Sequence, residues 1–179
     1  MPPKTGHAPE FSRSLAVEKI PSSGMIEKLE ADEQERRRVA GRFGLVEVKK
    51  LQAQLDIQHA RAGQAVAVTG RLVADIVQKC VVTLEPLATH VEHDIDVLYE
   101  ATAESETGGE LAHMEPDESE TEPLVNGIID LGELVTQNLG VAIDPYPRKP
   151  GVVFAETSAS TAISSGPFAK LAEWRKKKE

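Results

Sequence analysis

The sequence is short of the residues on which several common classes of function depend. Cys80 is the only cysteine among 179 residues, so no disulfide can form within the chain. The aromatic residues are four Phe, two Tyr and one Trp, which favours an aliphatic core and argues against the base-stacking sheets of common RNA-binding domains. No apolar run approaches the roughly 18 residues of a membrane span, and residues 1–7 lack the apolar centre of a secretory signal. These absences predict a cytoplasmic protein with no membrane partner.

Recognisable catalytic motifs are missing as well. The sequence has no glycine-rich phosphate loop, no serine elbow and no pair of carboxylates at a credible catalytic spacing. We therefore predict that the protein is not an enzyme and has no catalytic residue, cofactor, metal or small-molecule substrate.

The acidic charge of the chain is concentrated in one segment. The formal net charge is −9, from 29 acidic and 20 basic residues. Residues 100–123 hold nine carboxylates and no Lys or Arg, so the rest of the chain is neutral. This segment has almost no apolar content with which to offset its ordering entropy, and it is predicted to be a flexible acidic loop over residues 101–123. The net charge therefore does not exclude an RNA partner.

Residues 66–84 alternate apolar and polar side chains with the period of a β-strand. Such a strand has one face toward the core and one toward water. At about 3.3 Å per residue it would be roughly 60 Å long, so we predict that it bends or breaks at Gly70 or at residues 78–79. The apolar positions are Val66, Val68, Leu72, Ala74, Ile76, Cys80, Val82 and Leu84.

Two further segments show the same alternation. Residues 91–99 are predicted to form the return strand of a hairpin with the segment before them. In residues 46–57 the apolar positions change from even to odd across Lys49 and Lys50, which predicts a β-bulge there. Residues 59–64 are then expected to connect this strand to the one that starts near Ala65.

The N-terminal part combines extended segments with a helix. Residues 11–20 alternate as in a strand or an extended edge, and residues 25–29 form a second short extended piece. Asp32 followed by Glu35 has the form of a capping box, which predicts the start of a helix. Gly44 is placed to end that helix, because glycine adopts the left-handed conformation without steric cost.

A second helix is predicted after the acidic segment. Asp130 and Glu133 repeat the capping-box spacing. The helix is expected to stop at residues 144–145, where proline removes an amide donor and clashes with the preceding turn. Its apolar positions, Leu131, Leu134, Val135, Leu139 and Ala142, follow the helical period.

These elements predict an α+β fold in one domain. An antiparallel β-sheet, built from hairpins or a meander and strongly bent, packs against the two capped helices, with the long acidic loop and a basic C-terminal tail projecting from it. Residues 1–10 are predicted to be an N-terminal tail and residues 11–150 the domain. Residues 151–179 are predicted to be a flexible tail that contains a short basic helix.

The sole cysteine admits two interpretations. On the apolar face of a strand, Cys80 is most simply a buried structural thiol. If hairpin partners have residue numbers that sum to 173, Cys80 faces His93, and a sum of 175 places it opposite Ile95. His90 and His93 point to opposite faces of one strand, so they cannot share a site. A zinc- or redox-dependent protein centred on Cys80 is the alternative, although structural zinc needs four ligands.

Basic residues supply the candidate partner-binding surface. They could bind phosphate if the fold brings them together. The candidates are Arg36, Arg37, Arg38, Lys49, Lys50, Arg148, Lys149, Arg175, Lys176 and Lys177.

Two blocks of sequence, in this order and spacing, resemble the YceD family, the bacterial large ribosomal RNA subunit accumulation proteins, in their alphaproteobacterial form. The first block runs from Gln78 to Pro86, and the second runs from Ile129 to Pro150. The resemblance extends over residues 11–150. The motif residues are Cys80, Thr83, Leu84, Glu85, Pro86, Asp130, Leu131, Glu133, Asp144, Pro145, Tyr146 and Pro147.

The resemblance implies a small non-enzymatic factor needed for accumulation of large-subunit ribosomal RNA. Its partner would be that RNA, contacted by the basic residues, or a basic ribosomal protein held by the carboxylates of residues 104–122. Many relatives carry a second cysteine where this chain has Thr83, and threonine cannot replace a thiolate ligand. A generic protein-interaction adaptor with no link to ribosomes is the remaining alternative.

Overall fold

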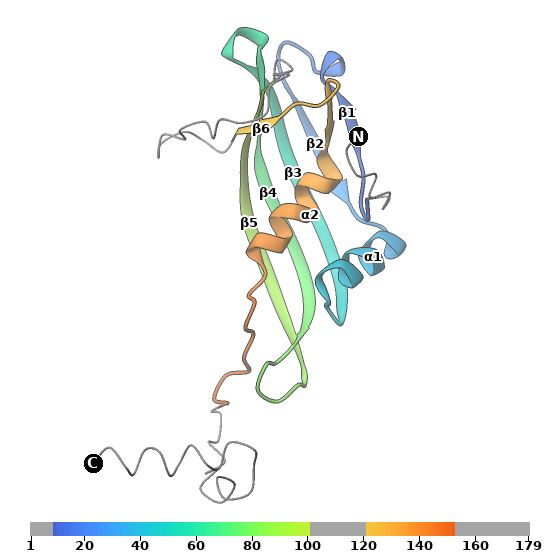
Figure 1. Cartoon of the computed structure of the whole chain (residues 1–179), viewed down its shortest axis with the longest axis vertical. Helices are drawn as coiled ribbons and strands as arrows, with labels where there is room; N and C mark the ends of the chain where they lie inside the picture. The colour runs from blue at the N-terminus through green and yellow to red at the C-terminus, as the bar shows by residue number, and fades with distance from the viewer. Residues whose placement is uncertain (1–8, 101–120, 153–179) are drawn as a thin grey trace, which may run out of the picture.

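The computed structural model describes residues 9–100 and 121–152. The described part is an α+β fold, as the sequence predicts. Strands and 3₁₀-helices alternate with two α-helices along the chain (Figure 1). In order they are β1 (Ser14–Ala16), η1 (Val17–Lys19), β2 (Met25–Glu30), α1 (Glu33–Phe43), β3 (Glu47–Ala60), η2 (Arg61–Gly63), β4 (Ala65–Lys79), β5 (Pro86–Glu100), β6 (Thr121–Pro123), β7 (Ile128–Asp130) and α2 (Leu131–Ala142).

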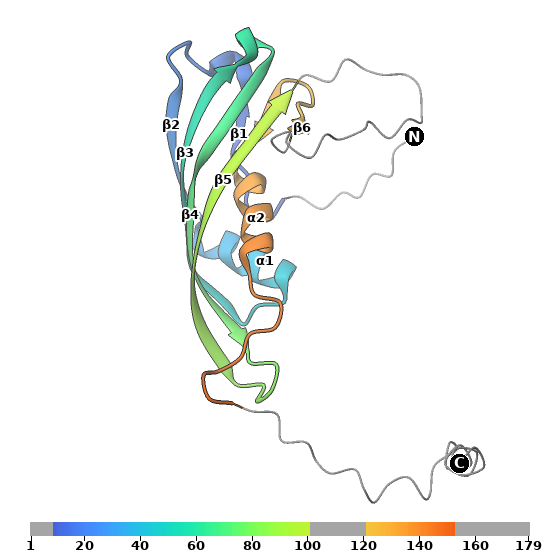
Figure 2. The ribbon, with the colours of Figure 1, turned by 90° about the vertical axis from the view of Figure 1, so that its left-hand side faces the viewer.

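A five-stranded sheet in the order β2-β3-β4-β5-β6 forms the body of the molecule. The four longer strands are antiparallel, and the short β6 pairs in parallel with β5. Strands β1 and β7 form a separate antiparallel pair. The long strands curve, and both helices lie on the concave side of the sheet (Figure 2). Within the described residues, no helix covers the opposite face (Figure 2).

The core forms between the concave face and the helices because the alternation of each strand places its apolar side chains there. Helix α1 packs on β3, while α2 packs on β4 and β5. The apolar face of α2 supplies Leu134, Val135 and Leu139, all at most 2% exposed. The buried strand residues include Leu51, Leu55, Ile57, Val66, Val68, Leu72, Ala74, Ile76, Val91, Ile95 and Val97.

The β3–β4 hairpin confirms two predictions, the bulge near Lys49 and Lys50 and the short connection over residues 59–64. The pairing register shifts between Val48 and Lys50, where the apolar phase slips. The strands are joined by η2, in which Arg61 and Ala62 have positive φ values of 47° and 56°. The connection is therefore tight. The pairing of β3 with β4 is continuous from Ala60 and Ala65, next to this connection, to the bulge before Lys50.

Of the two places predicted for a bend or break, residues 78–79 are where the strand ends, and no break occurs at Gly70. Strand β4 runs through Gly70, which pairs with Leu55 on one side and Ile95 on the other, and it ends at Lys79. A Cβ atom at Gly70 would overlap the carbonyl oxygen of Gln54 and lie 2.9 Å from Leu55 Cα. Glycine is required here because the backbone of β3 passes too close for a side chain.

The N-terminal segment is less regular than predicted. Only Ser14–Ala16 is strand, and it pairs with β7 instead of joining the large sheet. Phe11 is 1% exposed. A Cβ atom at Gly132 would lie 2.7 Å from Phe11 O. The start of α2 is therefore packed directly against this segment, which explains why a glycine follows Leu131.

The capping box of α1 is confirmed. Asp32 Oδ1 accepts from Glu35 N at 2.8 Å, and Glu35 Oε2 accepts from Asp32 N at 2.8 Å. Gly44 ends the helix with φ +63°. These local interactions fix both ends of α1, as the sequence signals require.

The second capping box forms only in half. Asp130 Oδ1 accepts from Gly132 N at 3.1 Å and from Glu133 N at 3.2 Å, so Asp130 is the N-cap. Glu133 instead accepts from Arg42 Nη1 on α1, at 2.9 Å. Its carboxylate thus links the two helices, a use that the spacing to Asp130 could not reveal.

The chain from 101 to 120 and from 153 onward lies outside the described residues. The predicted acidic loop falls there except for Thr121–Pro123, which form β6. The predicted basic helix of the tail and the first eight residues also lie outside.

Candidate partner-binding site

The segment between β4 and β5, residues 80–85, is a turn and not the strand end that the alternation predicts. Cys80 directly follows β4, and its N–H donates to Glu85 O at 2.9 Å. Leu84 N donates to Cys80 O at 2.8 Å. Leu84 itself has φ +60°, a left-handed conformation that non-glycine residues seldom adopt. We call residues 80–85 the tip.

The hairpin register also differs from both proposed pairings. Lys79 pairs with Pro86, and Leu72 pairs with His93, so partner numbers sum to 165. Cys80 therefore faces neither His93 nor Ile95, and the predicted Cys80–His93 neighbour pair is wrong. Cys80 has no partner in the β4–β5 ladder because the turn begins at this residue, directly after the last pair, Lys79 and Pro86.

Residues 144–150, which follow α2, are fastened across the tip, and we call them the strap. Prolines at 145, 147 and 150 prevent the helix from continuing. Val81 N donates to Pro147 O at 2.9 Å, and Lys149 Nζ donates to Glu85 Oε2 at 2.7 Å. Gln78 Nε2 donates to Asp144 O at 2.9 Å. Two segments more than sixty residues apart in sequence are thereby joined into one surface.

Cys80 lies under the strap. Its side chain is fully buried, and its Sγ accepts from Lys149 N at 3.5 Å. The hydroxyl of Thr83, then the amides of Thr83, Lys149 and Val82, donate to the sulfur and lower the thiol pKa to about 6. Thr83 thus stabilises the thiolate by hydrogen bonding, although it cannot act as a thiolate ligand.

The residues around Cys80 do not fit a metal site. Among residues 9–100 and 121–152, no group of three or more His, Cys, Asp or Glu side chains is placed to hold a metal ion. The groups that lower the thiol pKa are hydrogen-bond donors of Thr83, Lys149 and Val82.

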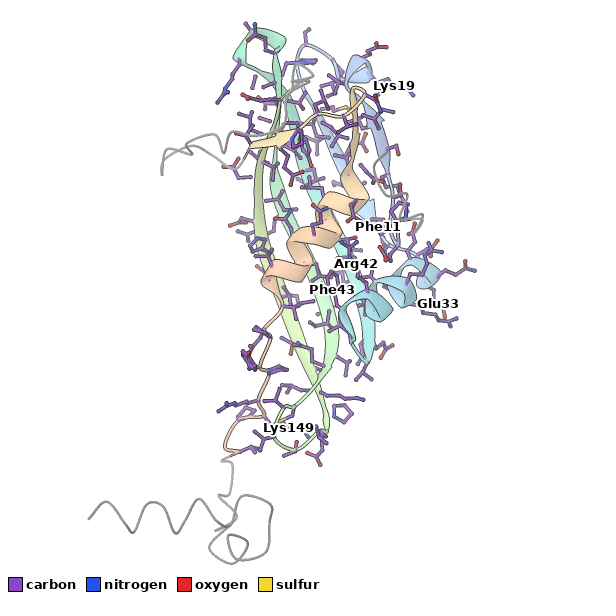
Figure 3. All side chains as sticks on the ribbon, in the orientation of Figure 1. Phe11, Lys19, Glu33, Arg42, Phe43 and Lys149 are labelled. Carbon is purple, nitrogen blue, oxygen red and sulfur yellow. The ribbon has the colours of Figure 1, made fainter. Side chains whose placement is uncertain are left out.

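The tip and the strap both carry exposed side chains, which are apolar, aromatic and basic. Leu84 and Tyr146 are each 71% exposed, and Val81 is 42% exposed. Arg148 is exposed, whereas Pro147 between Tyr146 and Arg148 is buried. This end of the molecule, marked by Lys149 in Figure 3, lies beyond the last turn of α2.

The structure divides the predicted basic residues into separate groups. Arg36, Arg37 and Lys49 line one groove between α1 and the start of β3. Arg38 points elsewhere on α1 and donates to Glu10 O at 3.0 Å. Lys50 lies opposite Asp75 on β4.

The remaining basic candidates lie away from the α1–β3 groove. Arg148 and Lys149 are in the strap, and Arg175, Lys176 and Lys177 lie outside the described residues. The predicted basic residues therefore do not form one continuous patch in the described structure.

Part of the positive charge in the α1–β3 groove is already engaged. Arg36 Nη1 donates to Ala31 O at 2.6 Å, and Arg37 forms an exposed ion pair with Glu33. Lys49 is exposed at the bulge, where the chain leaves the regular ladder. An anion could bind in the groove only by competing with the contacts that Arg36 makes to Ala31 O and Arg37 makes to Glu33.

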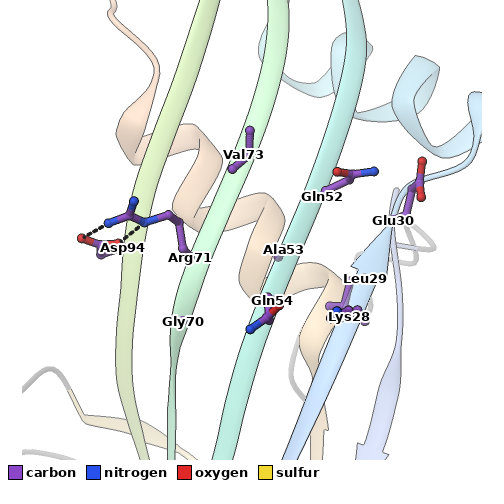
Figure 4. A pocket seen from close by; sticks show the side chains of 10 residues that line it. All are labelled: Lys28, Leu29, Glu30, Gln52, Ala53, Gln54, Gly70, Arg71, Val73 and Asp94. Carbon is purple, nitrogen blue, oxygen red and sulfur yellow. Dashed lines mark hydrogen bonds and ion pairs between the residues drawn. The ribbon is translucent and has the colours of Figure 1, made fainter.

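The open face of the sheet carries a charged network that the sequence analysis did not identify. Arg71 Nε donates to Asp94 Oδ1 at 2.7 Å across β4 and β5, and this pair borders a shallow hollow (Figure 4). Nearby, His90 Nδ1 lies 2.6 Å from Asp75 Oδ1, and this hydrogen bond, with that to Glu92, raises the histidine pKa. The alternation placed these residues on the wet face, but only the register shows which of them meet.

Comparisons with known proteins give one positive result. A family model described as "Large ribosomal RNA subunit accumulation protein YceD" matches residues 68–172. No curated protein and no solved structure matches the chain. In the part of the chain that the structure describes, neither helix is long and apolar enough to cross a membrane. The matched region includes both the tip and the strap.

Proposed function

The chain belongs to the YceD family of large ribosomal RNA subunit accumulation proteins, and from this membership we propose that it is a non-enzymatic ribosome-biogenesis factor. It acts in the cytoplasm and promotes accumulation or processing of large-subunit ribosomal RNA. It does so by binding that RNA or a basic ribosomal protein. The single observation that carries this proposal is the family match over residues 68–172.

The arrangement of the matched residues supports a binding role. Within the match, the structure describes a surface made by the tip and the strap, with exposed Tyr146 and Arg148 held on a rigid backbone. Rigid, exposed aromatic and arginine side chains are typical of interaction surfaces. The α1–β3 groove with Arg36, Arg37 and Lys49 provides a second candidate contact for phosphate.

The proposal is tested by deleting the gene and separating ribosomal particles on sucrose gradients. A reduced amount of large subunits, with a lower ratio of large- to small-subunit ribosomal RNA, is the expected result. A plasmid copy of the full chain should restore the ratio. Normal amounts of large subunit and of its RNA in the deletion strain would contradict the proposal.

The two partner classes make opposite predictions about the acidic segment. Residues 104–119 can be replaced by a short Gly/Ser linker, which leaves Thr121–Pro123 available to form β6. If the carboxylates hold a basic ribosomal protein, this deletion should weaken binding. If the partner is RNA, the deletion should leave binding unchanged or strengthen it, because a source of repulsion is removed.

A further inference from the structure

The backbone of the strap is restrained on both sides of Tyr146. Pro145 and Pro147 restrict the backbone on both sides of the residue. Tyr146 N donates to Asp144 Oδ1 at 2.8 Å, and Pro147 O accepts from Val81 N at 2.9 Å. The ring is nevertheless 71% exposed. An exposed aromatic ring on a restrained backbone loses less conformational entropy when a partner stacks on it than one on a free backbone would.

Arg148 lies two residues further along the strap, with Pro147 buried between them. Arg148 has no ion-pair partner among residues 9–100 and 121–152. The next cation, Lys149, is by contrast engaged with Glu85 at 2.7 Å. Within the described residues, Arg148 is therefore available for an external anion, whereas Lys149 fastens the strap to the tip.

The other aromatic residues that the structure describes are not exposed enough for a base to stack on them. Phe11 and Tyr99 are buried, and Phe43 is only partly exposed against the core. Tyr146 is thus the described aromatic side chain with an open face. Arg148 is exposed two residues further along the strap, and Leu84 of the tip is 71% exposed.

From this geometry we propose that the tip and strap bind an unpaired RNA base, which stacks on Tyr146 while Arg148 contacts the adjacent phosphate. The inference rests on the proposed function and specifies its partner as single-stranded RNA. Stacking of a splayed base on an aromatic ring, with a nearby cation on the backbone, is how proteins read unpaired RNA. The choice of RNA over a protein follows from the guanidinium of Arg148, which has no ion-pair partner within the described residues and complements a phosphate.

The test measures binding of the full-length chain to a fluorescein-labelled oligouridylate of twelve nucleotides, by fluorescence anisotropy over a series of salt concentrations. Tyr146→Ala is expected to weaken binding about 5- to 150-fold, the range for loss of one base–aromatic stack. Tyr146→Phe should stay within about twofold of the parent, since it keeps the ring. Arg148→Ala should weaken binding and reduce the salt slope by about 0.7, as for one lost contact to single-stranded phosphate.

Two controls separate stacking from general effects. Ile26→Ala removes an apolar side chain that is 61% exposed on the open sheet face and should leave RNA affinity unchanged. A twelve-base-pair RNA duplex should bind Tyr146→Ala as well as it binds the parent, because its bases are not free to stack. Circular dichroism establishes that each variant is folded, and the Tyr146→Phe comparison with Arg148→Ala still tests the proposal if Tyr146→Ala does not fold.

Several outcomes would overturn the inference. They are the absence of binding to the oligonucleotide at low salt, and equal affinity of Tyr146→Ala and Ile26→Ala. Unchanged RNA affinity in Tyr146→Ala, together with lost binding to a purified ribosomal protein, would also overturn it and favour a protein partner. In each case a ribosomal RNA defect in the deletion strain would leave the proposed function standing, so the two failures are distinguishable.

Discussion

The guanidinium of Arg13 donates two hydrogen bonds to the carboxylate of Glu35, from Nη1 to Oε1 at 2.7 Å and from Nη2 to Oε2 at 3.0 Å. Glu35 is also the acceptor in the capping box of α1, and only 7% of this residue is exposed. One carboxylate therefore fixes the start of α1 and ties the N-terminal segment to it. The pair stabilises the fold in a way that depends on pH.

We predict that Arg13→Ala lowers the free energy of unfolding by about 1–3 kcal/mol, the usual range for hydrogen bonds to a charged group. Urea unfolding at pH 7 measures the change. The matched control is Arg37→Ala, which removes the exposed ion pair to Glu33 on the same helix. That change should be below about 0.5 kcal/mol, and an equal loss in both variants would contradict the prediction.

The same pair predicts an acid-dependent loss of stability. The hydrogen bonds from Arg13 are the main cause that lowers the pKa of Glu35. A carboxyl whose folded pKa is depressed contributes stability that is present above its unfolded pKa, about 4.3. That contribution is lost as the pH falls through the folded value. Stability should therefore fall below about pH 4, and the fall should be smaller in Arg13→Ala, as measured by urea midpoints from pH 7 to pH 3.

Gly70→Ala is predicted to destabilise the sheet by about 3 kcal/mol, because the new Cβ would overlap Gln54 O on β3. The contrasting variant is Gly41→Ala in α1, where a Cβ would meet nothing within 4 Å. Alanine there should stabilise the protein by up to about 1 kcal/mol through its higher helix propensity. Thermal unfolding of both variants is the measurement. A tolerated Gly70→Ala would show that β3 and β4 do not approach as described.

The buried thiol should titrate at low pH. Absorbance of the thiolate at 240 nm reports on Cys80 alone, because it is the only cysteine. The midpoint is expected near pH 6. Thr83→Ala should raise it, since the Thr83 hydroxyl is the largest cause of the lowered pKa. A midpoint in the ordinary range of about 8–9 in the parent protein would show that the tip does not place these donors on the sulfur.

Cys80→Ser decides between a structural and a chemical role for this residue. If Cys80 only packs beneath the strap, the variant should restore large-subunit levels in a deletion strain, and metal analysis of the parent protein should find no zinc. The matched comparison is Tyr146→Ala, which should fail to restore them. Loss of function in Cys80→Ser with the fold intact by circular dichroism would favour the redox or zinc alternative.

The elements held by short-range interactions could be predicted from the sequence. The capping box of Asp32 and Glu35, the bulge at Lys49 and Lys50, and the return strand to Tyr99 all depend on neighbours in sequence or on side-chain period. The period predicts that a face is buried, but it does not say where a strand stops. The apolar alternation continues through Val82 and Leu84, although the strand ends at Lys79 and backbone hydrogen bonds close a turn after it.

The contacts of the candidate site could not be predicted from the sequence either. Both sequence blocks that carry the family resemblance were identified, but nothing in either block predicts that Pro147 would accept from Val81 or that Lys149 would reach Glu85. The basic residues were identified as well. Only the structure separates Arg36, Arg37 and Lys49 in the groove from Arg148 on the strap.

The sequence alone determined the α+β class, the sheet with one wet face and the helix starts, because hydrophobic period and capping chemistry act between residues a few positions apart. The tertiary structure alone decided the hairpin register, the close approach of β3 at Gly70 and the clamping of the strap over the tip. These depend on backbone groups and surfaces from distant segments, which become partners only when the sheet and helices pack together.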